Sequence, residues 1–74
     1  MAARVTLYTI PDCPFCSAKR QELDGRAVSY TEIDVRTHPE RVAELMKLTG
    51  GRRVVPVLVE GGSILVAPDG GSSF

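Results

Sequence analysis

Two cysteines stand three positions apart in Cys13-Pro14-Phe15-Cys16, between a strand-like stretch and a helix-like one. Thiols at the start of a helix face unpaired main-chain N–H groups and the positive end of the helix dipole, and both favour the thiolate. Pro14 suits the first helical position, where an N–H would have no partner. Residues three apart on a helix share a face, so the two thiols can form a small disulfide. The spacing predicts thiol–disulfide exchange, with Cys13 attacking and Cys16 resolving the mixed disulfide.

The cysteine pair has two other interpretations. The thiols could be inert and buried, or they could be half of a zinc site. Zinc normally takes four ligands, and the only other good candidate is His38, which lies far along the chain. We therefore expect no metal site and interpret His38 as a residue of a helix start.

The first half of the chain predicts a strand, a helix and a second strand. Residues 4–10 alternate polar and apolar side chains, which is typical of a strand. A helix is expected from about Pro14 to Leu23, and residues 28–35 again read as a strand. Thr37 and Glu40 then have the spacing of a capping box.

The helix that this box would open carries its apolar residues on one face and ends at Gly50. Residues 54–60 predict a strand that Pro56 interrupts, and a two-residue Gly-Gly turn joins it to a strand over residues 63–67. Residues 68–74 read as a loop and tail.

The order β-α-β-α-β-β predicts the fold class. A strand, a crossover helix and a parallel strand form a right-handed unit, and a closing hairpin adds antiparallel strands. We expect one α/β domain over residues 1–74, with a four-stranded mixed sheet and a thioredoxin-like architecture of minimal size.

Length and charge exclude several classes. The chain has 74 residues, with nine Lys and Arg against nine Asp and Glu, so no net charge draws it to nucleic acid or anionic lipid. No apolar stretch is long enough to span a membrane, and residues 1–10 lack the pattern of a secretory signal. We expect a cytoplasmic protein, a setting in which a lone cysteine pair is more often catalytic than structural.

Residues near the third strand are candidates for binding a substrate. A proline inside a strand marks an edge, a bulge or a cis bond. If the Val55-Pro56 bond is cis and lies beside Cys13, the main chain of Val55 could pair with an extended thiol substrate; otherwise Pro56 is an edge residue without a role. Arg52 and Arg53 could bind the carboxylates of a peptide-like ligand, or be solvated charges.

Lys19 and Arg20 follow the cysteine pair on the same helix. Their positive charges could favour the Cys13 thiolate. They could equally be surface residues.

The chain resembles the glutaredoxin family over residues 4–66. The resemblance rests on the Cys-Pro-Phe-Cys segment, on Val54-Val55-Pro56, where the family usually has Thr-Val-Pro, and on the later pair Gly70-Gly71. It implies that Cys13 forms a mixed disulfide with glutathione and that Cys16 completes the dithiol route. It also implies a cis Val55-Pro56 bond and main-chain pairing of glutathione at Val55 and Pro56. With the two arginines, we expect a substrate-binding site that comprises Val55, Pro56, Arg52, Arg53 and Phe15. The chain is similar, too, to short glutaredoxin-like proteins in which selenocysteine can stand at the position of Cys13.

The sequence departs from the family pattern in three places. Ile10 replaces a lysine, Ser72-Ser73 replaces an acidic pair, and the sequence stops where the family's last helix would begin. The first two changes remove charged anchors for glutathione. The third leaves one face of the sheet less covered, so we expect a monomer or a weak dimer.

These observations predict a small glutaredoxin-like thiol–disulfide oxidoreductase that reduces protein disulfides or glutathione mixed disulfides. We expect no tightly bound cofactor, and glutathione or another small thiol as the co-substrate. Two alternatives stay open: reduction by a thioredoxin-reductase-type flavoprotein, and an iron–sulfur cluster shared by two chains through Cys13 with glutathione as co-ligand.

Overall fold

The computed structural model describes residues 4–74. The elements follow in the order β1 (Val5–Thr9), α1 (Pro14–Gly25), β2 (Thr31–Asp34), the 3-10 turn η1 (Pro39–Arg41), α2 (Val42–Thr49), β3 (Val54–Val55), β4 (Val57–Glu60), β5 (Ser63–Val66) and β6 (Ser72–Ser73). The main sheet has the strand order β2-β1-β4-β5, in which β1 and β2 are parallel and the other pairs antiparallel. The expected four-stranded mixed sheet is confirmed.

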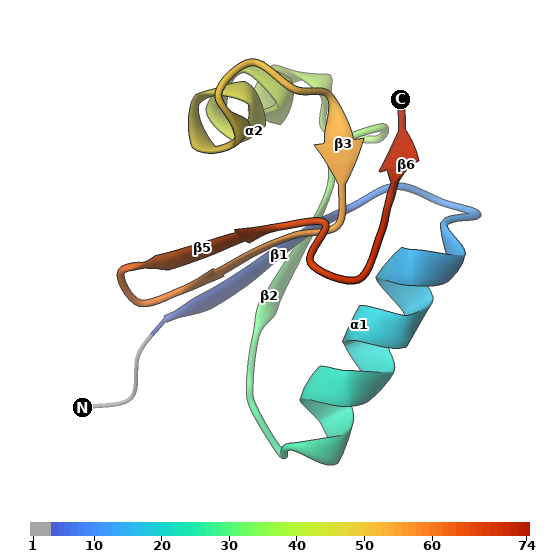
Figure 1. Cartoon of the computed structure of the whole chain (residues 1–74), viewed down its shortest axis with the longest axis vertical. Helices are drawn as coiled ribbons and strands as arrows, with labels where there is room; N and C mark the ends of the chain where they lie inside the picture. Colours follow the sequence, from blue (N-terminus) through green and yellow to red (C-terminus); the bar gives the residue numbers. More distant parts are fainter. Residues whose placement is uncertain (1–3) are drawn as a thin grey trace.

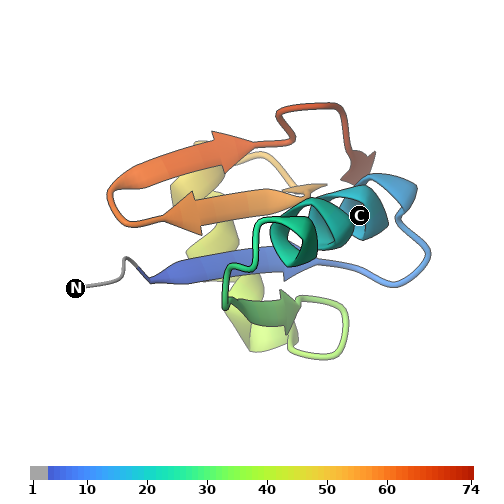
Figure 2. The same ribbon diagram turned by 90° about the horizontal axis from the view of Figure 1, so that it is seen from below.

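The two helices cover opposite faces of this sheet (Figures 1 and 2). Alternation along β1 sends Leu7 toward α1, where it packs with Leu23, and Tyr8 toward α2, where it packs with Leu45. The Tyr8 hydroxyl also donates a hydrogen bond to Glu44 of α2. The cysteine pair belongs to the α2-side cluster, which therefore links the dithiol to the core.

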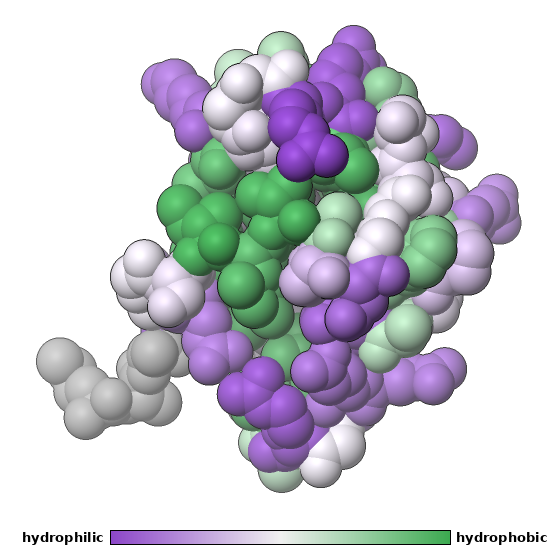
Figure 3. Space-filling model, viewed as in Figure 1, coloured by the Kyte–Doolittle hydropathy of each residue, from purple (hydrophilic) through white to green (hydrophobic). Residues whose placement is uncertain are grey.

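The outer strand β5 leaves apolar surface exposed. Ile64 and Leu65 are 44% and 45% exposed, and strand alternation directs them to opposite faces of the sheet. Figure 3 shows apolar surface gathered on the side that carries β5 and α2. The monomer or weak dimer stays a prediction.

The strand expected over residues 28–35 is shorter than predicted. Val28 and Tyr30 precede β2, because the Val28 N–H donates to the Leu23 carbonyl at 3.1 Å and closes the end of α1. Ala27, with φ 55°, makes the turn that this bond needs. Because the segment is rich in β-forming residues, its composition predicted a strand where the structure has this turn.

The predicted capping box is wrong. The Asp34 carboxylate accepts the N–H groups of Arg36 and Thr37, and the Thr37 hydroxyl donates to the Asp34 carbonyl. Thr37 is thus committed to the turn after β2, and no side chain caps either η1 or α2. The other end of α2 is as expected, since Gly50 closes it with φ 72°.

The last part of the chain differs most from its prediction. Pro56 divides the expected strand into β3 and β4, while Glu60 pairs with Ser63 around the predicted two-residue turn. Residues 68–74 are not merely a tail, because β6 pairs antiparallel with β3 to form a second sheet of two strands. Val55 of β3 belongs to the same core cluster as Cys13 and Cys16, and Phe74, which follows β6, packs against that cluster. The second sheet therefore lies next to the cysteine pair.

Candidate active site

Cys13 is the N-cap residue of α1. Its backbone is extended, Pro14 follows at the first helical position, and its sulfur accepts the Cys16 N–H at 3.3 Å. The preceding turn, in which Asp12 has φ 60°, carries the chain from β1 into the helix. No disulfide joins the two thiols. The helix start therefore directs a main-chain donor at the sulfur that the sequence predicted to attack.

The two thiols differ in pKa. Burial by itself would raise the pKa of Cys13, but hydrogen bonds from the Cys16 thiol and the Ser72 hydroxyl, with those from two main-chain N–H groups, hold it below the ordinary value. Burial raises the pKa of Cys16 to about 12, together with its hydrogen bond to Cys13 and the negative charge of that neighbour. As the pH rises, Cys13 therefore loses its proton before Cys16 does.

Lys19 and Arg20 do not have the role that their charge suggested. Lys19 is buried and forms ion pairs with Glu22 and Asp69, while Arg20 forms one with Glu32 at 2.7 Å. The causes of the lowered Cys13 pKa are hydrogen bonds, and neither cation contributes one. Arg20 instead acts on the second thiol, since its positive charge works against the raised pKa of Cys16.

Cys13 is far less accessible than a nucleophile at a helix mouth was expected to be. It is 2% exposed and Cys16 is 0% exposed, so exposure does not separate the two. Ser72 of β6 lies near Cys13, since its hydroxyl is one of the groups that lower the pKa of that thiol. Residues far along the chain therefore help to bury the dithiol.

The main chain of Val55 is not free, contrary to expectation. The Val55-Pro56 peptide bond is cis, as predicted, and both residues are buried. Val55 pairs with Ser72 in the β3–β6 ladder, and two positions away the Phe74 N–H donates to the Arg53 carbonyl at 3.3 Å. In an antiparallel ladder, opposite residues alternate between hydrogen-bonded and non-hydrogen-bonded pairs. Because Arg53 and Phe74 form a hydrogen-bonded pair, Val55 and Ser72 do so as well, which occupies the Val55 groups that a substrate was expected to use.

The segment before β6 is fitted closely to the site. A Cβ added at Gly71 would lie 2.2 Å from the Val55 carbonyl oxygen, and one at Gly70 would lie 2.9 Å from the Phe15 ring. Phe15 is otherwise 40% exposed beside the site. Asp69 ties the same segment to Lys19 at 3.2 Å. The Gly70-Gly71 pair was the sequence signal for this close approach. Ser72 stood out only as a departure from the family pattern, and Asp69 had no signal.

The two arginines lie in different settings. Arg53 stacks its guanidinium over the Phe74 ring, 5.0 Å from the centroid. The main chain of Arg52 is held by Thr49, whose hydroxyl donates to the Arg52 carbonyl at 2.6 Å and accepts its N–H at 2.9 Å. Both side chains adjoin β3, but Arg53 already has an intramolecular partner.

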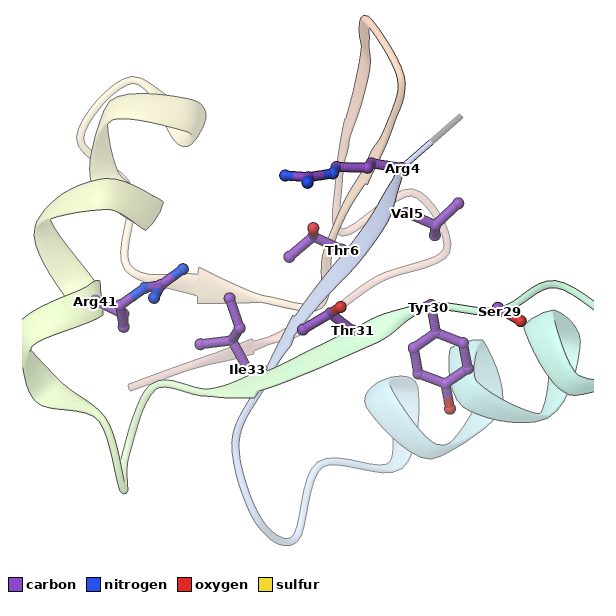
Figure 4. A pocket seen from close by; sticks show the side chains of 8 residues that line it. All are labelled: Arg4, Val5, Thr6, Ser29, Tyr30, Thr31, Ile33 and Arg41. Carbon is purple, nitrogen blue, oxygen red and sulfur yellow. The ribbon is translucent and has the colours of Figure 1, made fainter. Parts of the chain in front are cut away.

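A surface depression lies elsewhere. It measures about 660 Å³ and is lined by residues of β1, β2 and their flanks, with Arg4 and Arg41 reaching toward one another across Thr6 and Thr31 (Figure 4). It opens beside the start of β1, whereas Cys13 follows the end of that strand. It takes no part in the dithiol chemistry.

No three His, Cys, Asp or Glu side chains among residues 4–74 gather where they could hold a metal ion. Within the same residues, no helix has the length and apolarity needed to cross a bilayer.

The different pKa values of the thiols predict a titration in two steps. Thiolate absorbance of the reduced protein should show a first midpoint below the free-thiol value of about 8.5. The second, from Cys16, should lie at about pH 12. Because a lower pKa leaves the thiolate populated at lower pH, the alkylation rate of Cys13 should reach its plateau at lower pH than that of a free thiol.

Ser72→Ala should raise the first midpoint, since it removes a hydrogen bond to the thiolate. Ser73→Ala is the matched control and should leave the first midpoint in place, since Ser73 is exposed and is not among the groups that shift the Cys13 pKa. A first midpoint at or above that of a free thiol, or an equal shift in the two variants, would contradict this account.

Comparison with known proteins agrees with the fold and the motifs. The Glutaredoxin family model matches residues 5–65. A glutaredoxin of Neisseria meningitidis is 38% identical over 56 residues, which cover 74% of this chain and 66% of the relative. A Mycobacterium tuberculosis protein, provisionally named a glutaredoxin, is 33% identical over 70 residues, or 92% of this chain and 82% of that protein. The chain thus spans just under two thirds of the Neisseria relative's length.

Solved structures give the same result. The NrdH-redoxin of Escherichia coli, a glutaredoxin-like protein, is similar with a TM-score of 0.72 and 32% identity, covering 84% of this chain and 79% of that one. A glutaredoxin of Archaeoglobus fulgidus has a TM-score of 0.75 and 21% identity, covering 96% and 77%, and shows the fold alone. The protein is therefore an α/β protein of the thioredoxin-like fold, and its dithiol has a thiol redox function. It belongs to the glutaredoxin family, as its motifs had indicated.

Proposed function

We propose that this protein is a small thiol–disulfide oxidoreductase in which Cys13 is the nucleophile and Cys16 the resolving thiol. The observation that carries the proposal is the position of Cys13 at the start of α1, where its sulfur accepts the Cys16 N–H at 3.3 Å and its pKa lies below that of its partner. A nucleophile must be a thiolate, and a resolving thiol must stay protonated until its turn.

The reaction follows from this arrangement. The Cys13 thiolate attacks one sulfur of a substrate disulfide, forms a mixed disulfide, and releases the other sulfur as a thiolate that takes up a proton. Cys16 then gives up its proton and attacks the Cys13 sulfur, which releases the reduced substrate and leaves a Cys13–Cys16 disulfide. Two thiols of a reductant supply the two electrons that restore the dithiol.

For the reductant we propose glutathione, with disulfide-containing proteins and glutathione mixed disulfides as substrates. The family membership supports this choice, and Arg52, beside the second sheet, offers a positive charge for a ligand carboxylate. Val55, Pro56 and Phe15 would form the walls of the same binding site.

A thioredoxin-reductase-type flavoprotein is the second candidate reductant. Ile10 stands where the family usually has a lysine, and Arg53 is engaged with Phe74, so few charged anchors for glutathione remain. The similar NrdH-redoxin is described as having a thioredoxin-like activity profile, which also favours this candidate.

Turnover with the two reductants side by side tests the proposal. One assay supplies glutathione, glutathione reductase and NADPH, and the other supplies thioredoxin reductase and NADPH, with the same protein disulfide as substrate. We expect turnover with glutathione. Turnover with the flavoprotein alone would assign the reductant to the second candidate, and none with either would overturn the oxidoreductase. A brown dimer after anaerobic reconstitution with iron and sulfide would instead favour the shared cluster.

A further inference from the structure

The segment from Gly71 to Phe74, here called the strap, lies where an extended substrate would have to lie. Its Ser72 pairs with Val55 in the β3–β6 ladder, so the Val55 N–H and carbonyl both face the strap. Its Gly71 approaches so closely that no side chain would fit against the Val55 carbonyl. The strap thus has the position and the antiparallel direction of a peptide added to β3.

The strap also covers the nucleophile. Cys13 is only 2% exposed, and Ser72 lies near its sulfur. Attack on a disulfide requires the incoming sulfur to approach the Cys13 sulfur along a free path. In the closed arrangement of this structure that path is blocked.

Weak contacts hold the strap in place. Its pairing with β3 extends over two residues on each side, against four in each pair of the main sheet. Phe74 is partly buried against the core cluster, its N–H donates to the Arg53 carbonyl at 3.3 Å, and its ring stacks with the Arg53 guanidinium. Just before the strap, Asp69, whose side chain is 78% exposed, forms an ion pair with Lys19. A pairing of two residues contributes less than one of four, so this unit can open while the main sheet stays intact.

We propose that the strap is an intramolecular substitute for the substrate strand, and that a disulfide in an extended peptide reaches Cys13 by displacing it from Val55. This inference rests on the proposed function. It favours disulfides carried by an extended peptide, because such a main chain can remake with Val55 the pair that opening breaks. Gly71 and Ser72 then determine how readily Cys13 becomes accessible.

Two proline variants distinguish the loss of pairing between the strap and β3 from the general effect of introducing a proline. The Ser72 N–H faces β3, whereas the Ser73 N–H points away from it, since the Val54–Ser73 pair alternates with hydrogen-bonding pairs. Ser72→Pro therefore removes a bond of the ladder, and Ser73→Pro puts the same residue type one position away without removing one. Ser72→Ala removes only the hydroxyl and corrects for its effect on ionisation.

The readout is the plateau rate of Cys13 alkylation by iodoacetamide at high pH, measured in the Cys16→Ser background. Ser72→Pro should raise this rate about fivefold to tenfold, the effect of one lost main-chain hydrogen bond on the opening equilibrium. Ser73→Pro should leave the plateau rate unchanged. Ser72→Ala measures the part of the change that comes from losing the hydroxyl beside the Cys13 thiolate, and the fivefold to tenfold rise is counted relative to it. With the intact dithiol, kcat/KM for a peptide disulfide should rise in Ser72→Pro by the same factor, because both reactions need the same opening step.

Gly71→Ala gives an independent check, since its Cβ would displace the strap from the Val55 carbonyl, and Gly62→Ala, with open space around it, is its control. In the unaltered protein the Val55 amide should exchange with deuterium faster than the amides of β4. Equal alkylation rates in Ser72→Pro and Ser73→Pro, or deuterium exchange at the Val55 amide as slow as in β4, would contradict the proposal that the strap opens. Faster alkylation of Ser72→Pro, with no disulfide turnover in any variant, would contradict the proposed oxidoreductase function but still support the opening of the strap.

Discussion

Replacing Cys13 with serine should abolish thiol–disulfide exchange with every disulfide substrate, a loss of at least about a thousandfold. Cys13 alone combines a lowered pKa with a place at the helix start, and the second thiol keeps its proton to about pH 12. A serine hydroxyl neither ionises near neutral pH nor forms a disulfide, so no mixed disulfide can arise.

Cys16→Ser should be milder, because removal of glutathione from a mixed disulfide needs only the attacking thiolate. The serine hydroxyl can still donate to the Cys13 sulfur, so the thiolate keeps a partner. Reduction of protein disulfides, which depends on the resolving thiol, should be lost.

Steady-state rates with a glutathione mixed disulfide and with a protein disulfide, measured for both variants beside the wild type, check these expectations. Circular dichroism of each variant verifies that the fold is intact. Activity retained in Cys13→Ser and lost in Cys16→Ser would reverse the two roles.

Changing both Arg52 and Arg53 to alanine should raise the Michaelis constant for glutathione about tenfold or more. Glutathione carries two carboxylates, and Ile10 and Ser72-Ser73 supply no charge to meet them. A charge-assisted hydrogen bond contributes about 1.5–3 kcal/mol when well formed and much less when solvated, and about 1.4 kcal/mol corresponds to a factor of ten. Since Arg53 already stacks on Phe74, the single variant Arg52→Ala should account for most of the change.

The effect on a protein disulfide should be smaller, because main-chain pairing dominates its binding. Arg36→Ala is the matched control, since it removes the same charge from an exposed turn after β2. If glutathione kinetics stay unchanged in the double variant, the two arginines are solvated charges, and the flavoprotein becomes the favoured reductant.

Much of the architecture followed from local patterns. Alternation over residues 4–10 located β1, the apolar face ending at Gly50 located α2, and the Gly61-Gly62 pair located the β4–β5 turn. These features depend on residues close in sequence, for which side-chain period and glycine conformation are direct indicators.

The errors arose where a local signal had a stronger competitor. Thr37 has the spacing of a capping residue, but the Asp34 carboxylate binds two nearby N–H groups and takes Thr37 into its own turn. Val28 is a strand-forming residue, but its N–H closes α1. In both cases the choice depends on hydrogen bonds that composition does not show.

The sequence by itself determined the dithiol, the order of the four strands and two helices of the main sheet, and the family. It did so because the Cys-Pro-Phe-Cys spacing and the helix start that follows are local, as are the periods of the strands. Only the tertiary structure decided how Cys13 is buried and what occupies Val55, because residues 13, 55 and 72 are far apart in the chain. Two serines in an apparent tail carry no period or motif, so their pairing with β3 becomes visible only once the sheet has brought these segments together.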